Sequence, residues 1–212
     1  MDRQLGSRDA VLKDLDLVLH EGECVALVGD NGSGKTTVAR LLSGMLRPTR
    51  GVCRWTRGAP EPGTDIGVLL QEPRDQLFCE SVQDEVAFGP RNFGRYADPV
   101  IESLLAAADL LSLRERPLHT LSSGQLHRTA LASVLALHPR LLVLDEPTIG
   151  QDWRHLELLM DVVEQLRLGG TSVLLISHDF KLIHHHATRV VLLRHGHVAA
   201  EGVPLAAPAE GE

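Results

Sequence analysis

A glycine-rich loop at residues 29–36 constrains this chain more than any other feature of its 212 residues. The loop fits the pattern G-x-x-x-x-G-K-[ST]. A continuous apolar run, Cys24–Val28, precedes it and is typical of a strand buried on both faces. Residues 37–42 follow it and are predicted to be helical. This order of strand, loop and helix predicts a phosphate-binding loop.

The residue types in the loop suit a phosphate for physical reasons. Glycine has no Cβ, so backbone N–H groups can close around phosphate oxygens, and the positive end of the following helix adds to the attraction. Lys35 is expected to reach the β- and γ-phosphates of a nucleotide, and the Thr36 hydroxyl is expected to bind Mg²⁺. The predicted nucleotide contacts are Gly29, Asp30, Asn31, Gly32, Ser33, Gly34, Lys35, Thr36 and Thr37.

Two carboxylates follow a second buried strand, which is predicted at residues 141–144. Asp145 and Glu146 would stand at the carboxyl end of that strand, where open parallel sheets bind their ligands. Asp145 is expected beside Mg²⁺, held through water, and Glu146 is expected to polarise a water for attack on the γ-phosphate. A simple polar turn is the alternative reading of this pair, and the phosphate loop elsewhere in the chain weighs against it.

His178 closes a third apolar strand, predicted at residues 173–176. Its place at the end of a strand matches that of Asp145, so it could touch the γ-phosphate and the attacking water. A lone histidine in that position is more often a polar end to the strand, and both readings stay open on the residues alone.

The order of strands and helices predicts an α/β fold. Between the strands at 141–144 and 173–176, apolar residues recur at helical spacing, namely Leu156, Leu159, Val163 and Leu166. Strands that alternate with helices predict a mainly parallel sheet covered on both faces.

Shorter segments predict additional strands at both ends of the chain. Residues 190–193 and 198–200 flank a two-residue turn, which predicts a closing hairpin and hence a small antiparallel portion. Leu15, Leu17 and Leu19 alternate with other residues, which predicts a half-buried strand before the phosphate loop.

The middle of the chain has helical periods and few β-branched runs, so residues 73–138 are predicted to form a helical subdomain inserted into the core. The core would then comprise residues 1–72 and 139–205 of a single domain, 1–212. Residues 206–212, at the end of a tail rich in alanine and proline, are expected to be loose.

Composition excludes several classes of protein. The formal net charge is −7 and no dense basic run occurs, which disfavours nucleic acid as the main partner. Cys24, Cys53 and Cys79 are far apart, which argues against a zinc site or a disulfide framework. No apolar run approaches the ~18 residues that cross a bilayer, and the first residues lack a signal peptide's apolar stretch. We therefore expect a soluble cytoplasmic protein.

One further segment carries a family resemblance. Leu121, Ser122, Ser123, Gly124 and Gln125 resemble the LSGGQ signature of the ATP-binding cassette (ABC) family, whose P-loop core the chain would share. The family's other marks follow in order: the phosphate loop with Lys35, Gln71 after an apolar strand at 66–70, the Asp145 and Glu146 pair, the D-loop residue Asp152 and the switch residue His178.

The resemblance implies a site shared between two chains. In this family two cassettes pack head to tail, and each ATP lies between one phosphate loop and the partner's signature. Ser122, Ser123, Gly124 and Gln125 would then serve the partner's nucleotide, and Asp152 would lie at the same seam. Gln71 would sense the γ-phosphate and bind Mg²⁺, and it would pass the motion to membrane helices near the helical subdomain.

A closer resemblance, to energy-coupling-factor importers of cobalt, nickel and vitamins, comes from residues 75–78 and 84–90. It implies a peripheral ATPase on the cytoplasmic face of the cell membrane. Its partners would be a second ABC ATPase subunit, identical or different, and an integral membrane transport subunit. A soluble non-transport ABC ATPase is the alternative, as is a weakly hydrolysing regulatory subunit.

Three features depart from the family pattern or suggest another site. Ser123 stands where the signature usually has its first glycine, so its Cβ could crowd the partner's phosphates. No aromatic residue precedes Trp55, so either base stacking is lost or the first strand is missing from the start of the chain. Three adjacent histidines, 184–186, would point in different directions on a helix, so we expect a solvated surface there.

Overall fold

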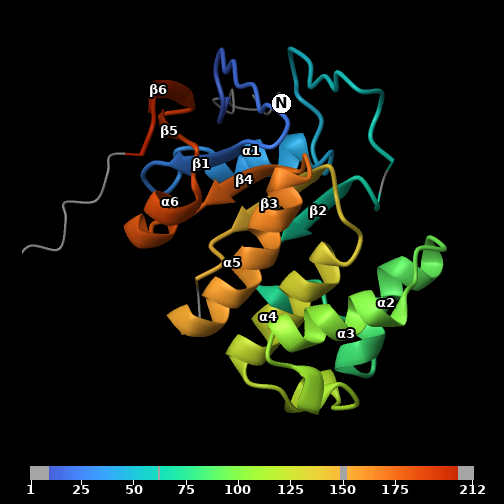
Figure 1. Ribbon diagram of the computed structural model, residues 1–212. Helices are drawn as coiled ribbons and strands as arrows, with labels where there is room; N and C mark the ends of the chain where they lie inside the picture. Colours follow the sequence, from blue (N-terminus) through green and yellow to red (C-terminus); the bar gives the residue numbers. More distant parts are fainter. Residues whose placement is uncertain (1–9, 62, 149–151, 205–212) are drawn as a thin grey trace, which may run out of the picture.

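A single sheet runs through the protein, seen here in a computed structural model that describes residues 10–61, 63–148 and 152–204 (Figure 1). The strand order in the described ranges is β2-β3-β4-β1-β5-β6, parallel throughout except for the β5–β6 pair. The strands are β1 Cys24–Val28, β2 Ile66–Leu69, β3 Leu141–Asp145, β4 Ser172–Ile176, β5 Arg189–Arg194 and β6 His197–Gly202. The α-helices are α1 Lys35–Leu42, α2 Val82–Asn92, α3 Asp98–Ala107, α4 Ser123–Leu135, α5 Trp153–Leu168 and α6 Phe180–His186.

Successive residues of the central strands enter two different hydrophobic clusters, because side chains alternate between the two faces of a sheet. In β3, Leu142 and Leu144 belong to one cluster, while Leu141 and Val143 belong to the other. All four are buried. This burial on both faces explains why these strands read as continuous apolar runs.

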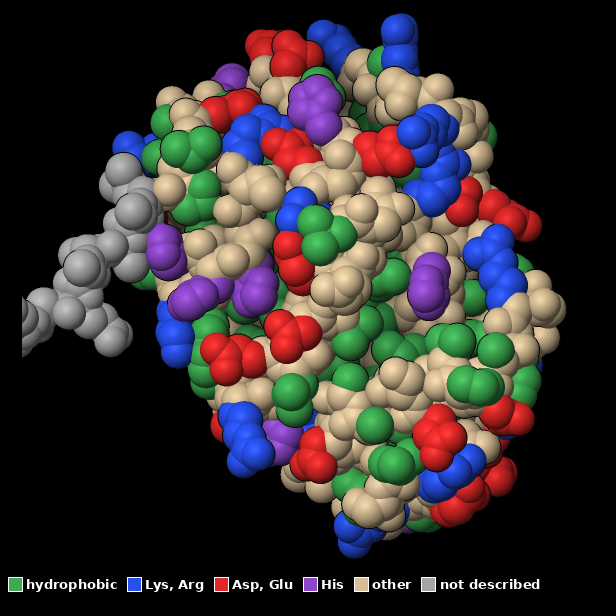
Figure 2. Space-filling model, viewed as in Figure 1, with side chains coloured by type: hydrophobic (Ala, Val, Ile, Leu, Met, Phe, Trp, Pro, Cys, Tyr) green, Lys and Arg blue, Asp and Glu red, His purple; other side chains and the backbone are tan. Residues whose placement is uncertain are grey.

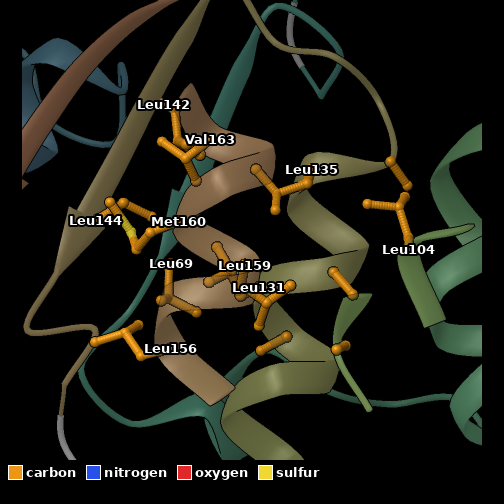
Figure 3. Close-up of a cluster of buried hydrophobic side chains, with 14 of the residues drawn as sticks. Leu69, Leu104, Leu131, Leu135, Leu142, Leu144, Leu156, Leu159, Met160 and Val163 are labelled. Carbon is orange, nitrogen blue, oxygen red and sulfur yellow. The ribbon is translucent and has the colours of Figure 1, made fainter. Parts of the chain in front are cut away.

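The two faces are covered differently. Val38 and Ala39 of α1 pack on one face, together with the half-buried leucines that precede β1. On the other face α4 and α5 lie against the sheet, and Figure 3 shows Leu131 of α4 and Leu159 of α5 meeting Leu69 of β2. This second cluster continues into α2 and α3. The helical part of the chain, residues 73–138, therefore shares one core with the sheet.

Gly67 allows α4 to approach β2 closely. A Cβ at this position would lie 2.5 Å from Cγ1 of Val134, which is too close for real atoms, and a tight 3.0 Å from Cγ of Pro139. Glycine therefore lets the helix pack on the strand that leads to Gln71.

The predicted α/β class is confirmed, with a mainly parallel sheet and one antiparallel pair. Each strand predicted from an apolar run is present, and β5 and β6 form the predicted hairpin. Its turn residues, His195 and Gly196, have φ values of 47° and 81°, as a tight hairpin turn requires. Between residues 70 and 138 the structure has helices and turns, with only one isolated bridge, Ser81–Pro117.

The strand predicted around Leu15, Leu17 and Leu19 is wrong. The three leucines are half-buried and pack on the β1 face, so the alternation of burial is real. A strand also needs a neighbouring backbone to bond with. The carbonyl of Val18 instead accepts a hydrogen bond from the side chain of Arg189, and no strand among the described residues pairs with this segment.

Some predictions concern residues outside the described ranges, namely the missing first strand at the start of the chain and the loose tail at 206–212. No helix within the described ranges has both the length and the apolar character needed to cross a bilayer.

Candidate nucleotide-binding site

The phosphate loop joins β1 to α1 and is held in shape by its own lysine. Lys35 is only 8% exposed, and its Nζ donates hydrogen bonds to the carbonyls of Gly29 (2.6 Å) and Asp30 (3.1 Å). α1 begins at Lys35 with Gly34 as its N-cap, so the free N–H groups of its first turn face the loop. The loop therefore presents backbone donors, a helix N-terminus and an ammonium group together.

Two details of the loop are its close packing on β5 and a buried hydroxyl without a partner. Gly29 has a φ of 149°, and a Cβ there would lie 2.2 Å from the carbonyl oxygen of Leu193. The Ser33 hydroxyl is buried and makes no hydrogen bond to the described residues. Buried hydroxyl groups normally have a hydrogen-bond partner, and a phosphate oxygen bound near the loop is one group that could fill this role.

Asp145 ends β3 and reaches the phosphate loop. The Thr36 hydroxyl donates a hydrogen bond to its Oδ2 at 3.4 Å, and the residue is 6% exposed. Burial, reinforced by the charge of Glu146, raises the pKa of the Asp145 carboxyl, while Thr36, Lys35 and Arg40 oppose this. A bound divalent cation would favour the ionised carboxylate, so Thr36 and Asp145 fit a Mg²⁺ site.

Glu146 and His178 meet at the adjacent strand ends. Glu146 donates its backbone N–H to the carbonyl of Ile176 at 2.8 Å, a bond that belongs to the last register pair of β3 and β4, Asp145–Ile176. Its carboxylate accepts from the backbone N–H of His178 at 3.4 Å, and its Oε1 lies 3.5 Å from His178 Nε2. The Glu146 side chain is 14% exposed and that of His178 is 58% exposed.

These groups border one cavity of about 450 Å³. Its lining residues are Val11, Asn31, Gly32, Gly34, Lys35, Thr36, Thr37, Gln71, Asp145, Glu146, Ile176 and His178. Residues predicted from separate motifs thus come together, whereas Gly29, Asp30 and Ser33 shape the loop behind its lining. Sequence reasoning missed Val11 and Ile176 because nothing in their residue types signals a ligand contact.

Gln71 follows β2 and is supported by a residue with no predicted role. The Oε1 atom of Gln76 accepts a hydrogen bond from the backbone N–H of Leu70 at 2.9 Å. Buried Glu85 of α2 accepts from the N–H groups of Phe78 (3.0 Å) and Cys79 (2.8 Å). The segment that follows Gln71 is therefore hydrogen-bonded both to Leu70, just before Gln71, and to α2.

The four signature residues lie elsewhere, at the N-terminus of α4. Ser122 caps the helix, and its side chain accepts from the N–H of Gln125 while the Gln125 side chain accepts from the N–H of Ser122. Ser122 and Ser123 are exposed, and Gly124 is half-buried. Neither this helix end nor Asp152, which caps α5, lines the cavity.

The three adjacent histidines lie on α6, where Figure 2 shows histidine side chains on the surface. His185 is exposed, but His184 and His186 are half-buried, so the predicted solvated surface describes only the middle one. Burial and the neighbouring His185 lower the pKa of His186.

Comparison with known proteins gives consistent relatives. The family model described as "ABC transporter" matches residues 12–149. A putative ABC transporter ATP-binding protein of Streptomyces coelicolor is 45% identical over 81% of this chain, which spans only 64% of that relative's length. The cobalt import ATP-binding protein CbiO of Rhodobacter capsulatus is 40% identical over 92% of this chain and 74% of its own. The energy-coupling factor transporter ATP-binding protein EcfA2 of Thermotoga maritima is 37% identical over 90% and 74%.

A solved structure agrees with the fold. CbiO1 from Clostridium perfringens, part of the ABC transporter complex cbiONQ, superposes with a TM-score of 0.76 at 29% identity. The match covers 92% of this chain and 82% of CbiO1.

Proposed function

This chain belongs to the ABC transporter ATPase family, and we propose that it binds ATP with Mg²⁺ and hydrolyses the nucleotide as one half of a dimer. The single cavity lined by the phosphate loop, Gln71, Asp145, Glu146 and His178 carries this proposal. These segments are far apart in the sequence, and each brings a group that phosphoryl transfer to water needs.

Binding is assigned to the loop and to the oxygen-bearing groups beside it. Lys35 and the N–H groups around it hold the β- and γ-phosphates. Thr36, Asp145 and Gln71 would hold Mg²⁺, with Asp145 acting through water. When bound, Mg²⁺ neutralises charge on the phosphate oxygens.

Glu146 is assigned as the general base. Its carboxylate is largely shielded at the strand end and sits on the cavity wall, where it can accept a proton from a water placed for in-line attack. His178, 3.5 Å away, can hold the same water or the γ-phosphate. Gln71 orients water and senses whether the γ-phosphate is present.

Ser122, Ser123, Gly124 and Gln125 are assigned to the nucleotide of a second ABC subunit. Their support is the exposed, well-capped N-terminus of α4, which presents N–H groups away from this chain's own cavity. ATP would then join two subunits, with Asp152 at the seam. Hydrolysis removes the γ-phosphate and lets the subunits part.

The cobalt import and energy-coupling factor relatives support a role as the motor of an energy-coupling-factor importer. That the importer takes up a metal ion or vitamin, with this subunit on the cytoplasmic face of the cell membrane, is proposed from the resemblance of residues 75–78 and 84–90. An integral membrane subunit could dock on the helical part, where hydrophobic side chains reach the surface (Figure 2). Phe78 and Phe88 are 66% and 44% exposed, and their rings meet edge to face at 4.7 Å. Such exposed aromatic pairs are typical of interfaces.

Ser123 favours a second candidate, a subunit that binds ATP but completes its partner's site poorly. Its Cβ stands at the first turn of α4, where a phosphate would approach the backbone. In a heterodimer this would make one of the two sites slow.

Affinity purification of the subunit from its own membranes, followed by mass spectrometry, tests the assignment. We expect a multi-spanning membrane protein to be recovered, and a second cassette subunit in the heterodimer case. Recovery of only soluble partners, or of ribosomal or nucleic-acid-bound proteins, would place the non-transport ABC ATPase first.

A further inference from the structure

His155, in the first turn of α5, lies between two carboxylates from different parts of the chain. Its Nδ1 is 2.5 Å from Oδ2 of Asp152, the N-cap of the same helix. Its Nε2 is 3.1 Å from Oδ2 of Asp109, which directly follows α3 and its capping residue. The second oxygen of Asp152 accepts the backbone N–H of His155 at 3.1 Å.

The protonation state of the ring follows from what its partners can do. An ionised carboxylate accepts hydrogen bonds but donates none, and a neutral imidazole has one N–H. His155 can therefore serve both carboxylates only as an imidazolium ion, which has two N–H donors. One cation then joins two anions that would otherwise repel each other.

The side chains of His155, Asp109 and Asp152 are partly exposed, which limits the strength of the interaction between their charges. The His155 side chain is 26% exposed, and those of Asp109 and Asp152 are 66% and 61% exposed. The buried guanidinium of Arg128 on α4 also attracts Asp152. The backbone and ring of His155 hold the pKa of the Asp152 carboxyl below its usual range. Asp109 has a φ of 52°, a left-handed value of the kind at which helices commonly end.

We propose that His155 is a positioning residue that, as an imidazolium ion, clasps Asp152 to Asp109 and thereby fixes the start of α5 against the helical part of the subunit. The consequence for turnover rests on the proposed function, in which Asp152 lies at the seam with a partner subunit. The clasp exists only while both ring nitrogens carry a proton, because each carboxylate needs one donor. It should therefore support turnover more at mildly acidic than at alkaline pH.

The clasp itself can be tested on the purified chain without any activity. The ¹⁵N chemical shifts of a histidine ring distinguish imidazolium from the neutral tautomers, and the His155 signal is identified by its loss in His155→Gln. We expect both nitrogens to be protonated at about pH 6, and Asp109→Asn to reduce that form at the same pH. Asp161→Asn, the same charge change on the exposed face of the same helix, should leave it unchanged. A neutral ring at about pH 6 in the parent chain would overturn the proposal.

The positioning role can be tested in the complex purified from membranes. We expect His155→Gln to lower kcat about two- to fivefold at about pH 6, with KM for ATP unchanged and a smaller difference at about pH 8.5. His155→Arg carries a permanent charge with several donors and should retain kcat at both pH values. Parallel pH profiles for the parent and His155→Gln, or equal losses in His155→Gln and His155→Arg, would contradict the role. If even the parent complex hydrolysed no ATP, the proposed function would fail, while the ring spectrum would still decide on the clasp.

Discussion

Glu146 has an unusual backbone conformation for a residue at the end of a strand. It follows a regular strand, yet its φ is 53°, a left-handed value that non-glycine residues seldom adopt. The hydrogen bond from its N–H to Ile176 holds it there and leaves the carboxylate beside His178. Strain of this kind is concentrated at functional sites, where the surrounding structure enforces it.

Replacing Glu146 by Gln should keep ATP binding but lower turnover about 10²- to 10⁴-fold, because the amide cannot accept the proton of water. The nucleotide-bound dimer should accumulate, which size-exclusion chromatography with ATP and Mg²⁺ would detect. Glu102→Gln, an exposed change on α3, is the matched control. Turnover at the parent rate in Glu146→Gln would show that Glu146 is not the base.

Replacing Lys35 by Ala should weaken ATP binding about 10- to 100-fold, because charge-assisted hydrogen bonds to the phosphates are lost. Isothermal titration calorimetry of the isolated subunit measures this directly. Lys181→Ala removes the same group from α6, outside the cavity lining, and should leave the affinity unchanged. Equal affinity in the parent and Lys35→Ala would refute the phosphate-loop assignment.

At the scale of elements, parallel strands bring the reacting groups to one edge of the sheet. β1 leads into the phosphate loop, β3 ends in Asp145, and His178 follows β4 closely. Because these strands are parallel neighbours, their carboxyl ends lie side by side. The helices packed on the sheet hold these strand ends in place. α5 does so through a stripe of buried side chains that includes Leu159.

Leu159→Ala should lower the free energy of unfolding by about 2–5 kcal/mol, because it opens a cavity where α4, α5 and β2 meet. Leu159 is fully buried, whereas its neighbour Leu158 is 43% exposed, so Leu158→Ala should change stability by less than about 0.5 kcal/mol. Urea denaturation followed by circular dichroism compares the two. Similar losses in both variants would mean that α5 is not seated on this core.

At the scale of the whole molecule, the chain presents two separate surfaces for one chemistry. Lys35 and Glu146 line the cavity, whereas the N-terminus of α4, with its N–H groups, lies outside that lining. In the proposed function a single subunit would supply one half of each of two sites, which is the physical reason for proposing a dimer. Ser123 acts at this scale, since its effect would fall on the partner's nucleotide.

Ser123→Gly should raise turnover in the assembled complex about two- to tenfold, because removal of the Cβ lets the backbone of α4 approach the partner's phosphate. Ser123→Ala is the matched control, because it keeps the Cβ and removes only the hydroxyl. Steady-state ATPase rates of the purified complex compare the three proteins. If Ser123→Ala accelerates turnover as much as Ser123→Gly, the hydroxyl rather than the Cβ is responsible.

The limits of sequence reasoning are clearest in particular residues. Cys24–Val28 and residues 141–144 were predictable as strands because a strand buried on both faces must be apolar at every position. Leu15, Leu17 and Leu19 showed a different signal, an alternation of apolar residues, which reports burial and not backbone pairing. Whether a segment pairs depends on which groups reach its backbone, and there Arg189 does.

The sequence by itself determined the phosphate loop, the order of the motifs and the α/β class, because each of these follows from local residue types and periodicity. Only the tertiary structure decided that Gln71, Asp145, Glu146 and His178 share a cavity with Lys35, and that Val11 and Ile176 join them. It also decided that His155 bridges Asp109 and Asp152, residues separated by an entire helix and strand of the chain. Such contacts depend on how the elements pack in space, which local patterns do not encode.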